Sequence, residues 1–374
     1  MKSPKAIKYL TWTSLAIVLV STLAWVGLSR VTGAINRVSV FDNLINRPEK
    51  ASSAVNYLVV GSDTREGLTA AELRQLRVGS TKTAAGARSD TMMLVHISKS
   101  RDNAVVISIP RDSLVTVPAH IGLDGKTQVP ETQAKINAAF AWGGAPLLIQ
   151  TIEAKTKLRI DHYVEVNFAG FKNVVDALGG IQVCTKKDIN DPGSHLVLSA
   201  GVHTLDGIEA LKYVRTRDFD GLGDIGRMQR QQQFVGAVFR KATSTGVLLN
   251  PFKLKNLISA VFKTVKTDET LSQGDIVNLA KQMKNLTPGK MRTLTIPLGT
   301  SNGYVSGLGS VVIWHETLAP ELFDRLRNDL PVVDEVKASP SAKSSKKSAS
   351  ASPSVIDKFK TSTASENLCG SIKY

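Results

Sequence analysis

The sequence predicts a layered domain of strands and helices around a covered sheet, of the α/β or α+β class, preceded by one transmembrane helix. Short apolar runs of strand length alternate with helical patterns along most of the chain, and one long uncharged run stands near its start. The 374 residues, 42% of them hydrophobic, are enough for one large domain or two ordinary ones.

The predicted transmembrane helix covers residues 9–29. The uncharged run from Tyr9 to Ser29 is rich in Leu, Val and Ala and is long enough to cross ~30 Å of hydrocarbon. Three lysines precede it in the segment 1–8 and two arginines follow it, which is a weak positive-inside bias. A cleaved signal peptide is the alternative, although its apolar region would be unusually long.

Either reading takes the remaining chain out of the cytoplasm. We therefore expect a single-pass protein of the cell membrane, with its N-terminus inside and its domain extracytoplasmic. The net charge of +15 suits an anionic membrane surface or an acidic polymer. Export makes nucleic acid an unlikely partner despite that charge, so we expect none.

A juxtamembrane connector is expected at residues 30–53 and the domain at 54–330. Strands are predicted where short apolar runs end at turn residues, namely at 54–60, 92–97, 104–109, 162–167, 181–185 and 292–297. Helices are predicted from capping signals and helical spacing at 146–157, 168–178, 206–213, 226–243, 254–265, 273–285 and 316–327. Residues 66–87, with a possible helical turn, and 115–134 are predicted to be loops.

The C-terminal segment 337–374 is predicted to be disordered. Ser, Lys, Ala and Pro dominate it to about residue 363, and this composition cannot bury a core. The chain has two cysteines, Cys184 and Cys369. Separate thiols are one reading, but an exported protein can keep a disulfide, and nothing else accounts for a cysteine in the tail.

Arginine and aspartate recur together in four short segments, at 61–65, 88–91, 110–112 and 215–231. Two of these follow predicted strands directly, where sites in such sheets gather. Converging guanidinium groups would repel one another unless they met a compact anion such as pyrophosphate, and Asp oxygens suit Mg²⁺. The alternative for any single pair is a surface salt bridge of little energetic value.

One helical face combines Arg227, Arg230 and Gln231, which are spaced i, i+3 and i+4 near a predicted helix start. A helix N-terminus also favours anions. The apolar residues behind them, such as Phe234 and Val235, are mostly expected in the core, while a few are candidates to line a lipid-accepting groove.

Seven motifs carry a family resemblance over roughly residues 54–245. They are Asn56–Arg65, Arg88–Leu94, Ile107–Asp112, Lys135–Phe140, Asp161–Phe168, Asp176–Gly180 and Arg215–Gln231. In this order they resemble the LytR-CpsA-Psr family, and several long motifs in register are far more specific than one short pattern. The tail around Cys369 resembles actinobacterial members.

The resemblance implies a three-layer α-β-α sandwich with a central mixed sheet and a hydrophobic pocket for a polyprenyl chain. It also implies a membrane-anchored phosphotransferase that moves a glycopolymer from a polyprenyl-pyrophosphate carrier to peptidoglycan, with Mg²⁺ as cofactor. A non-catalytic binder of polyprenyl-linked or anionic wall polymers is one alternative, and a membrane-bound transcription attenuator is another.

The same resemblance assigns roles to single residues. Asp63 and Asp90 match the Mg²⁺ ligands. The pyrophosphate contacts are expected to be Arg65, Arg88, Arg111, Arg215, Arg217, Arg227, Arg230 and Gln231. Arg111, Arg217 and Asp224 are expected to be catalytic, with Asp224 orienting an arginine or assisting proton removal.

Overall fold

A computed structural model describes residues 36–42, 44–79, 89–244, 265–271, 275, 286–335, 355–366 and 369. The predicted transmembrane helix at 9–29 lies outside these residues, and the predicted helices at 254–265 and 273–285 lie almost entirely outside them. Within the described part of the chain, no helix combines the length and apolar character that a membrane crossing requires.

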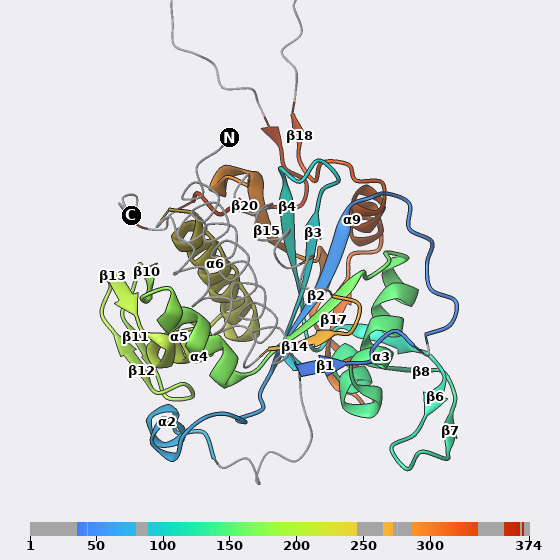
Figure 1. Cartoon of the computed structure of the whole chain (residues 1–374), viewed down its shortest axis with the longest axis horizontal. Helices are drawn as coiled ribbons and strands as arrows, with labels where there is room; N and C mark the ends of the chain where they lie inside the picture. The colour runs from blue at the N-terminus through green and yellow to red at the C-terminus, as the bar shows by residue number, and fades with distance from the viewer. Residues whose placement is uncertain are drawn as a thin grey trace, which may run out of the picture.

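A mixed sheet of eight strands runs through the middle of the domain (Figure 1). Its spatial order is β1 (Asn36–Val38), β14 (Val265–Asp268), β9 (His162–Val166), β2 (Val55–Ser62), β3 (Ser89–Ile97), β4 (Ala104–Ile109), β15 (Met291–Thr295) and β20 (Ser362–Thr363). β2 is parallel to β9 but antiparallel to β3, and β4 is parallel to β15 but antiparallel to β3. This arrangement confirms the predicted central mixed sheet.

Helices cover both faces of the sheet (Figure 1). On one face α3 (Ile136–Thr156) and α9 (Leu318–Arg327) pack in a core cluster with alternate strand residues such as Leu58 and Ile107. On the other face α6 (Gly223–Ser244) places Phe239 against Met93 and Val106. Successive residues of a strand point to opposite faces, so one strand serves both helical layers.

A second apolar cluster lies beside α6. It joins α4 (Phe168–Ala177) and α5 (Gly207–Tyr213) to the antiparallel pair β10 (Ile181–Thr185) and β13 (Gly201–Leu205). The sequence predicted α4, α5 and β10 but no strand at β13. Only Leu205 of β13 is buried, so its sequence lacks the alternation of apolar and polar residues that marks a strand. Short elements complete this side, namely α2 (Ala70–Leu76), β11 (Ile189–Asp191) and β12 (Leu196–Leu198).

The helix predicted from residue 146 begins ten residues earlier. α3 opens at Ile136 and is broken by Gly143 and Gly144, where Gly144 has φ +62°. Pro146 then starts the second helical segment, where its missing N–H costs nothing. The sequence signal at the proline therefore marked an internal break rather than the start of the element.

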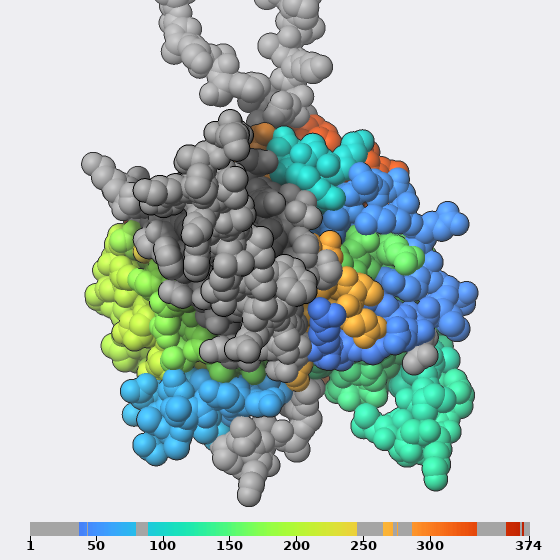
Figure 2. Space-filling view, in the orientation of Figure 1, coloured from blue at the N-terminus to red at the C-terminus, as the bar shows by residue number. Residues whose placement is uncertain are grey.

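The sequence predicts a loop at residues 115–134, but the structure has four strands in this region. β5 (Leu114–Val117) pairs with β8 (Thr132–Lys135), and β6 (His120–Ile121) pairs with β7 (Gln128–Val129). The prediction failed because β6 and β7 are largely solvated and lack apolar alternation. They form a lobe that projects from the surface (Figure 2).

A second hairpin and three short elements complete the described fold. They are β16 (Leu298–Val305), β17 (Gly309–Trp314), the 3₁₀ turn η1 (Pro288–Lys290), β18 (Asp334–Glu335) and β19 (Val355–Ile356). No element was predicted at residues 298–314. The helix predicted at 316–327 is confirmed as α9, with its start two residues later.

The expected boundaries of the domain are wrong at both ends. β1, within the predicted connector, pairs with β14, and Val40 is buried in the core. At the other end, β20 pairs with β15, Phe359 and Ala364 are buried, and Cys369 forms a disulfide with Cys184. The disulfide agrees with the expectation for an exported chain. Residues 355–366 are therefore ordered, because pairing and burial here depend on partners distant in sequence.

Candidate functional site

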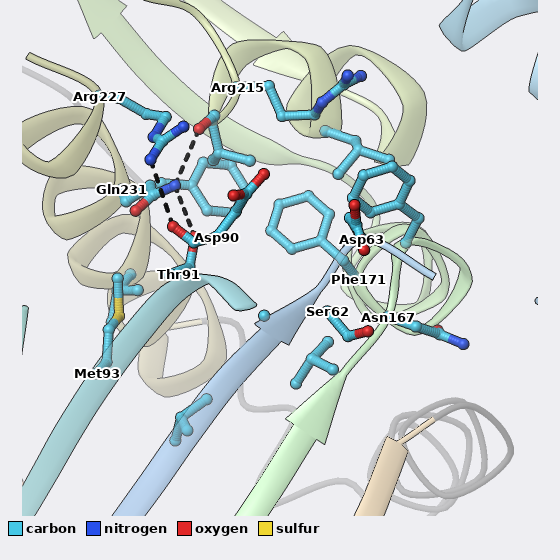
Figure 3. Close-up of a pocket in the computed structure, with 18 of the residues that line it drawn as sticks. Ser62, Asp63, Asp90, Thr91, Met93, Asn167, Phe171, Arg215, Arg227 and Gln231 are labelled. Carbon is cyan, nitrogen blue, oxygen red and sulfur yellow. Dashed lines mark hydrogen bonds between the residues drawn. The ribbon is translucent and has the colours of Figure 1, made fainter. Parts of the chain in front are cut away.

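A cavity of about 300 Å³ lies between the sheet and the helices α4, α5 and α6. It stands over the end of β2 and the start of β3, and its mouth is polar while its interior is apolar (Figure 3). The residues that line it are Val59, Gly61, Ser62, Asp63, Asp90, Thr91, Met93, Val166, Asn167, Phe168, Phe171, Gly193, Leu211, Val214, Arg215, Arg217, Asp218, Arg227, Gln231, Phe234 and Val235.

Capped helix starts bring two chain segments to this cavity. The side chain of Asn167 accepts a hydrogen bond from the Gly170 N–H at 2.7 Å and so begins α4 directly after β9. Asp206 caps α5 through the Glu209 N–H at 2.8 Å. Such caps satisfy backbone donors that the helix itself leaves open. The strand that ends at the cavity is thus followed at once by the helix that forms its wall.

Six of the predicted site residues line the cavity together, namely Asp63, Asp90, Arg215, Arg217, Arg227 and Gln231. Arg111 and Asp224 do not line it but are ion-paired with residues that do. Arg65 is not among the lining residues, although its charge acts on Arg215. Arg88 lies outside the described residues. The four segments rich in arginine and aspartate were expected to converge. The structure brings together residues of 61–65, 110–112 and 215–231, and it adds Asp90 from 88–91.

Arg111 holds the carboxylate of Asp90 at the β3–β4 side of the mouth. One Nη1–H donates to Asp90 Oδ1 at 2.6 Å, and Nε lies 3.5 Å from Asp112 Oδ2. Burial disfavours the charged guanidinium, but the hydrogen bond to Asp90 and the neighbouring carboxylates outweigh it, so the pKa of Arg111 is raised. Lys135 pairs with Asp112 at 3.0 Å and fixes the other side of this cluster.

Arg227 is 5% exposed and reaches the mouth from the first turns of α6. Its Nη2 lies 2.8 Å from Asp224 Oδ1 and donates to the backbone carbonyl of Asp90 at 3.3 Å (Figure 3). Its Nε–H makes no hydrogen bond with the described residues. Burial lowers the pKa of Arg227, aided by the charges of Arg111 and Arg217. A buried cation among other cations favours an anionic ligand.

Arg215 and Arg217 stand on the loop between α5 and α6. The guanidinium of Arg215 lies over the Phe168 ring at 5.2 Å, and its buried Nη1 has no hydrogen-bond partner among the described residues. Burial lowers the pKa of Arg215, and the charges of Arg65 and Arg217 lower it further. Arg217 is partly exposed and lies 3.6 Å from Asp224. Both guanidinium groups keep donors for a ligand.

Arg230 and Gln231 make hydrogen bonds that hold parts of the protein together. Arg230 is ion-paired with Asp220, donates to the Thr216 carbonyl at 2.6 Å and does not line the cavity. The Gln231 amide donates to the Thr91 hydroxyl at 3.0 Å and to the Val214 carbonyl at 3.2 Å (Figure 3). These bonds tie α6 to β3 and to the arginine loop.

The interior of the cavity is apolar. Phe171 of α4 and Phe234 of α6 pack with ring centroids 5.3 Å apart, and Val59 and Met93 line the floor from the sheet. Gly61 permits close packing at this point, since a Cβ there would lie 3.1 Å from Thr91 Cβ. An apolar interior beneath converging cations suits an amphipathic ligand with an anionic head.

Sequence reasoning missed Asp191, a carboxylate that positions the arginine loop. It is 1% exposed and accepts backbone N–H groups from Ser194 at 2.6 Å, Arg217 at 2.8 Å and Asp218 at 2.6 Å. Burial alone would raise its pKa, but these hydrogen bonds outweigh burial and lower it. The turn sequence Asp191-Pro192-Gly193 was its only local signal.

The two aspartates expected to bind Mg²⁺ both line the cavity. The described residues hold no cluster of three or more His, Cys, Asp or Glu side chains suited to a metal ion. Mg²⁺ needs no such cluster, because it is commonly held by one or two carboxylates together with water and substrate phosphates. Asp63 and Asp90 fit that donor set beside arginines that suit the phosphates.

The chain is similar to known proteins in sequence and in fold. The model of the LytR_cpsA_psr family matches residues 30–327. The probable cell wall biosynthesis protein LcpB of Corynebacterium glutamicum is 39% identical over 74% of this chain, and cell wall biosynthesis protein LcpA of that organism is 30% identical over 78%. The alignments span 62% and 60% of those relatives.

Two further relatives have more explicit names. The polyisoprenyl-teichoic acid–peptidoglycan teichoic acid transferase TagU of Oceanobacillus iheyensis is 29% identical over 76% of this chain and 78% of its own length. The solved structure of TagT bound to LIIa-WTA is 26% identical and covers 79% of this chain and 99% of its own, with a TM-score of 0.55. With a family model matched over most of its length, this chain belongs to the LytR-CpsA-Psr family.

Proposed function

We propose that this protein is a phosphotransferase of the cell wall, which transfers a glycopolymer from a polyprenyl-pyrophosphate carrier to peptidoglycan. The observation that carries the proposal is the meeting of Arg215, Arg217 and Arg227 with two carboxylates at the mouth of an apolar cavity. A polyprenyl pyrophosphate has the matching form, with a compact anion joined to a long hydrocarbon. The names of TagU and TagT support the same class of reaction.

In this proposal each part of the donor meets a different part of the cavity. The polyprenyl chain lies against the apolar lining that includes Phe171 and Phe234, and the pyrophosphate meets the guanidinium groups, whose planar forks bind phosphate oxygens in pairs. Asp224 orients Arg217 and Arg227 through its two ion pairs. That engagement favours the orienting role over proton removal.

The reaction is a displacement at phosphorus. A hydroxyl oxygen of peptidoglycan forms a bond to the phosphorus that carries the glycopolymer, and the bond from that phosphorus to the oxygen of polyprenyl phosphate breaks. The hydroxyl proton passes to water, and polyprenyl phosphate leaves. Negative charge grows on the leaving oxygen, so fixed cations at the mouth supply most of the catalysis.

Asp63 and Asp90 are the residues that would hold Mg²⁺. When bound, the ion would neutralise part of the pyrophosphate charge and stabilise the departing phosphate. Arg111 keeps the Asp90 carboxylate in position through the 2.6 Å hydrogen bond. Anchoring by residues 9–29, with the domain outside the membrane, is part of the same proposal, since the donor is a membrane lipid.

The test uses the full chain in detergent micelles with a polyprenyl-pyrophosphate-linked saccharide, a peptidoglycan oligomer and Mg²⁺. Mass spectrometry is expected to find the ligated product, and a chelator is expected to abolish it. Arg111→Ala should lose at least ~100-fold in rate while its circular dichroism stays unchanged, because Asp90 loses its partner. Binding of the donor without product, across a panel of saccharides, would favour a binding protein instead.

A further inference from the structure

The hairpin of β16 and β17 is chemically unlike the rest of the chain. From Leu298 to Trp314 it contains no Asp, Glu, Lys or Arg, although 21% of the whole chain is charged and the net charge is +15. Its first strand is mostly exposed and polar, with Thr300, Ser301 and Asn302 in succession. The hairpin thus presents a neutral, hydrogen-bonding surface beside a strongly cationic site.

Backbone contacts join this hairpin to the segment that carries Arg111. The Val312 N–H donates to the Asp112 carbonyl at 2.9 Å, Ser113 and Val312 form a parallel bridge, and the Trp314 indole donates to Ser113 Oγ at 2.8 Å. Because the pairing is parallel, residues before Val312 extend to the same side as residues before Ser113. The turn of the hairpin therefore lies on the Arg111 side of the bridge.

Tyr304 is the aromatic side chain displayed there. It pairs with Ser310 across the hairpin, and Ser310 lies two residues before Val312, whose N–H contacts Asp112. Its side chain is 80% exposed, so it has no role in the core. The turn beside it is closed by the Leu308 N–H, which donates to the Val305 carbonyl at 3.0 Å. An exposed ring on a hairpin that is joined to the Arg111 segment suggests a binding surface.

The residues of the hairpin favour one class of ligand over others. An anionic polymer would find no cation on it, and a membrane surface would require a broader apolar face than one ring among polar residues provides. A sugar ring offers an apolar face for stacking and hydroxyl and amide groups for the polar neighbours. The hairpin also contributes no residue to the lining of the apolar cavity under α4 and α6.

We propose that the β16–β17 hairpin docks the neutral glycan strand of the peptidoglycan acceptor, with Tyr304 stacked on a sugar ring. This inference rests on the proposed function, since it names where that reaction takes its acceptor. The donor occupies the cavity on the α6 side, and the acceptor hydroxyl approaches from the Arg111 side. An in-line displacement needs the incoming and departing oxygens on different faces of the phosphorus, so donor and acceptor require separate surfaces.

The kinetic test varies donor and acceptor separately with the full chain in detergent micelles. Tyr304→Ala is expected to raise the KM for soluble peptidoglycan glycan strands about tenfold, which corresponds to ~1.4 kcal/mol, with kcat and the KM for donor unchanged. Tyr304→Phe keeps the ring and should resemble the wild type. Val197→Ala, on the equally exposed β12, is the matched control and should change nothing.

A binding measurement separates this inference from the proposed function. A β-1,4-linked oligomer of N-acetylglucosamine, a neutral probe for the glycan strand, is passed over the immobilised full chain without donor, and Tyr304→Ala is expected to weaken its binding about tenfold. This result stands even if the wild type transfers nothing, an outcome that would overturn the proposed function alone. Equal glycan affinity of wild type and Tyr304→Ala, or a raised KM for donor instead of acceptor, would overturn the docking proposal.

Discussion

Arginine side chains near the cavity differ in whether they line it. Arg215, Arg227 and Arg230 each keep a buried donor atom that makes no hydrogen bond with the described residues, but Arg215 and Arg227 line the cavity and Arg230 does not. Leaving a buried donor unsatisfied costs about 1–3 kcal/mol. Such a cost is tolerated where a ligand later supplies the acceptor. This difference separates binding arginines from structural ones more sharply than sequence spacing does.

Lysine substitution at the two positions should therefore have opposite effects. Arg227→Lys keeps the charge but loses the forked donors, so we expect kcat/KM for the donor to fall ~100-fold with little change in Tm. Arg230→Lys should instead reduce the free energy of unfolding by about 1–3 kcal/mol, because a buried network loses hydrogen bonds. Kinetics and thermal unfolding of both variants check this. Equal losses of activity at equal stability would contradict the distinction.

Asp191 makes a pH-dependent contribution to stability. Its folded pKa lies below the unfolded value of about 3.9, so the stability it provides is present above that value and is lost as pH falls through the folded pKa. Asp191→Asn should lower the free energy of unfolding by about 1–3 kcal/mol at pH 7. Urea titrations between pH 3 and 7 should show that the free energy of unfolding falls less steeply with decreasing pH in this variant than in the wild type. If the free energies of unfolding of the two proteins differed by the same amount at every pH, the charge of Asp191 would not be the cause.

At the scale of elements, α6 connects the site to the C-terminal segment. Its first turns carry Arg227, its middle packs Phe239 on the sheet, and near its end Arg240 donates to the carbonyls of Ala364 and Glu366. β20 adds the outermost strand beside β15, and the disulfide from Cys369 to Cys184 fastens the chain after β20 to β10. Residues 355–366 and Cys369 thus stabilise the helix that carries Arg227.

Loss of the bridge should weaken this attachment. A disulfide that closes so long a stretch of chain, with partners 185 residues apart, stabilises by about 2–4 kcal/mol. We expect Cys369→Ser to lower Tm by several degrees and to increase amide hydrogen exchange in β15 and β20, which lose a neighbour. Adding reductant should lower the Tm of the wild type but not that of the variant. An unchanged exchange pattern in β15 would show that β20 holds without the bridge.

At the scale of the molecule, the site forms where several strand ends meet helix starts. Asp63 follows β2, Asp90 opens β3, Arg111 follows β4, and Arg227 enters from α6. β2 and β3 are antiparallel neighbours, so the end of one and the start of the next share an edge. Residues far apart in sequence are therefore brought together by the order of strands in the sheet.

The proposed topology predicts which side of the membrane this site faces. Alkaline phosphatase, which is active only outside the cytoplasm, is fused after residue 50. We expect full activity with residues 9–29 present and background activity when they are deleted, because this uncharged run is the element expected to reach across the membrane. Activity of a cytoplasmic reporter at the same position would support the transcription attenuator instead.

Local chemistry determined a large part of this protein. Apolar runs predicted β2, β3, β4 and β9, helix start and stop signals predicted α4 and α5, and the arginine-rich motifs predicted cations that converge, because strand-length burial and helix caps depend on neighbours in sequence. The tertiary structure alone decided the rest. It removed Arg230 from the cavity, added Asp191, and ordered β1 and β20, since each of these outcomes depends on a partner distant in the chain that no local pattern encodes.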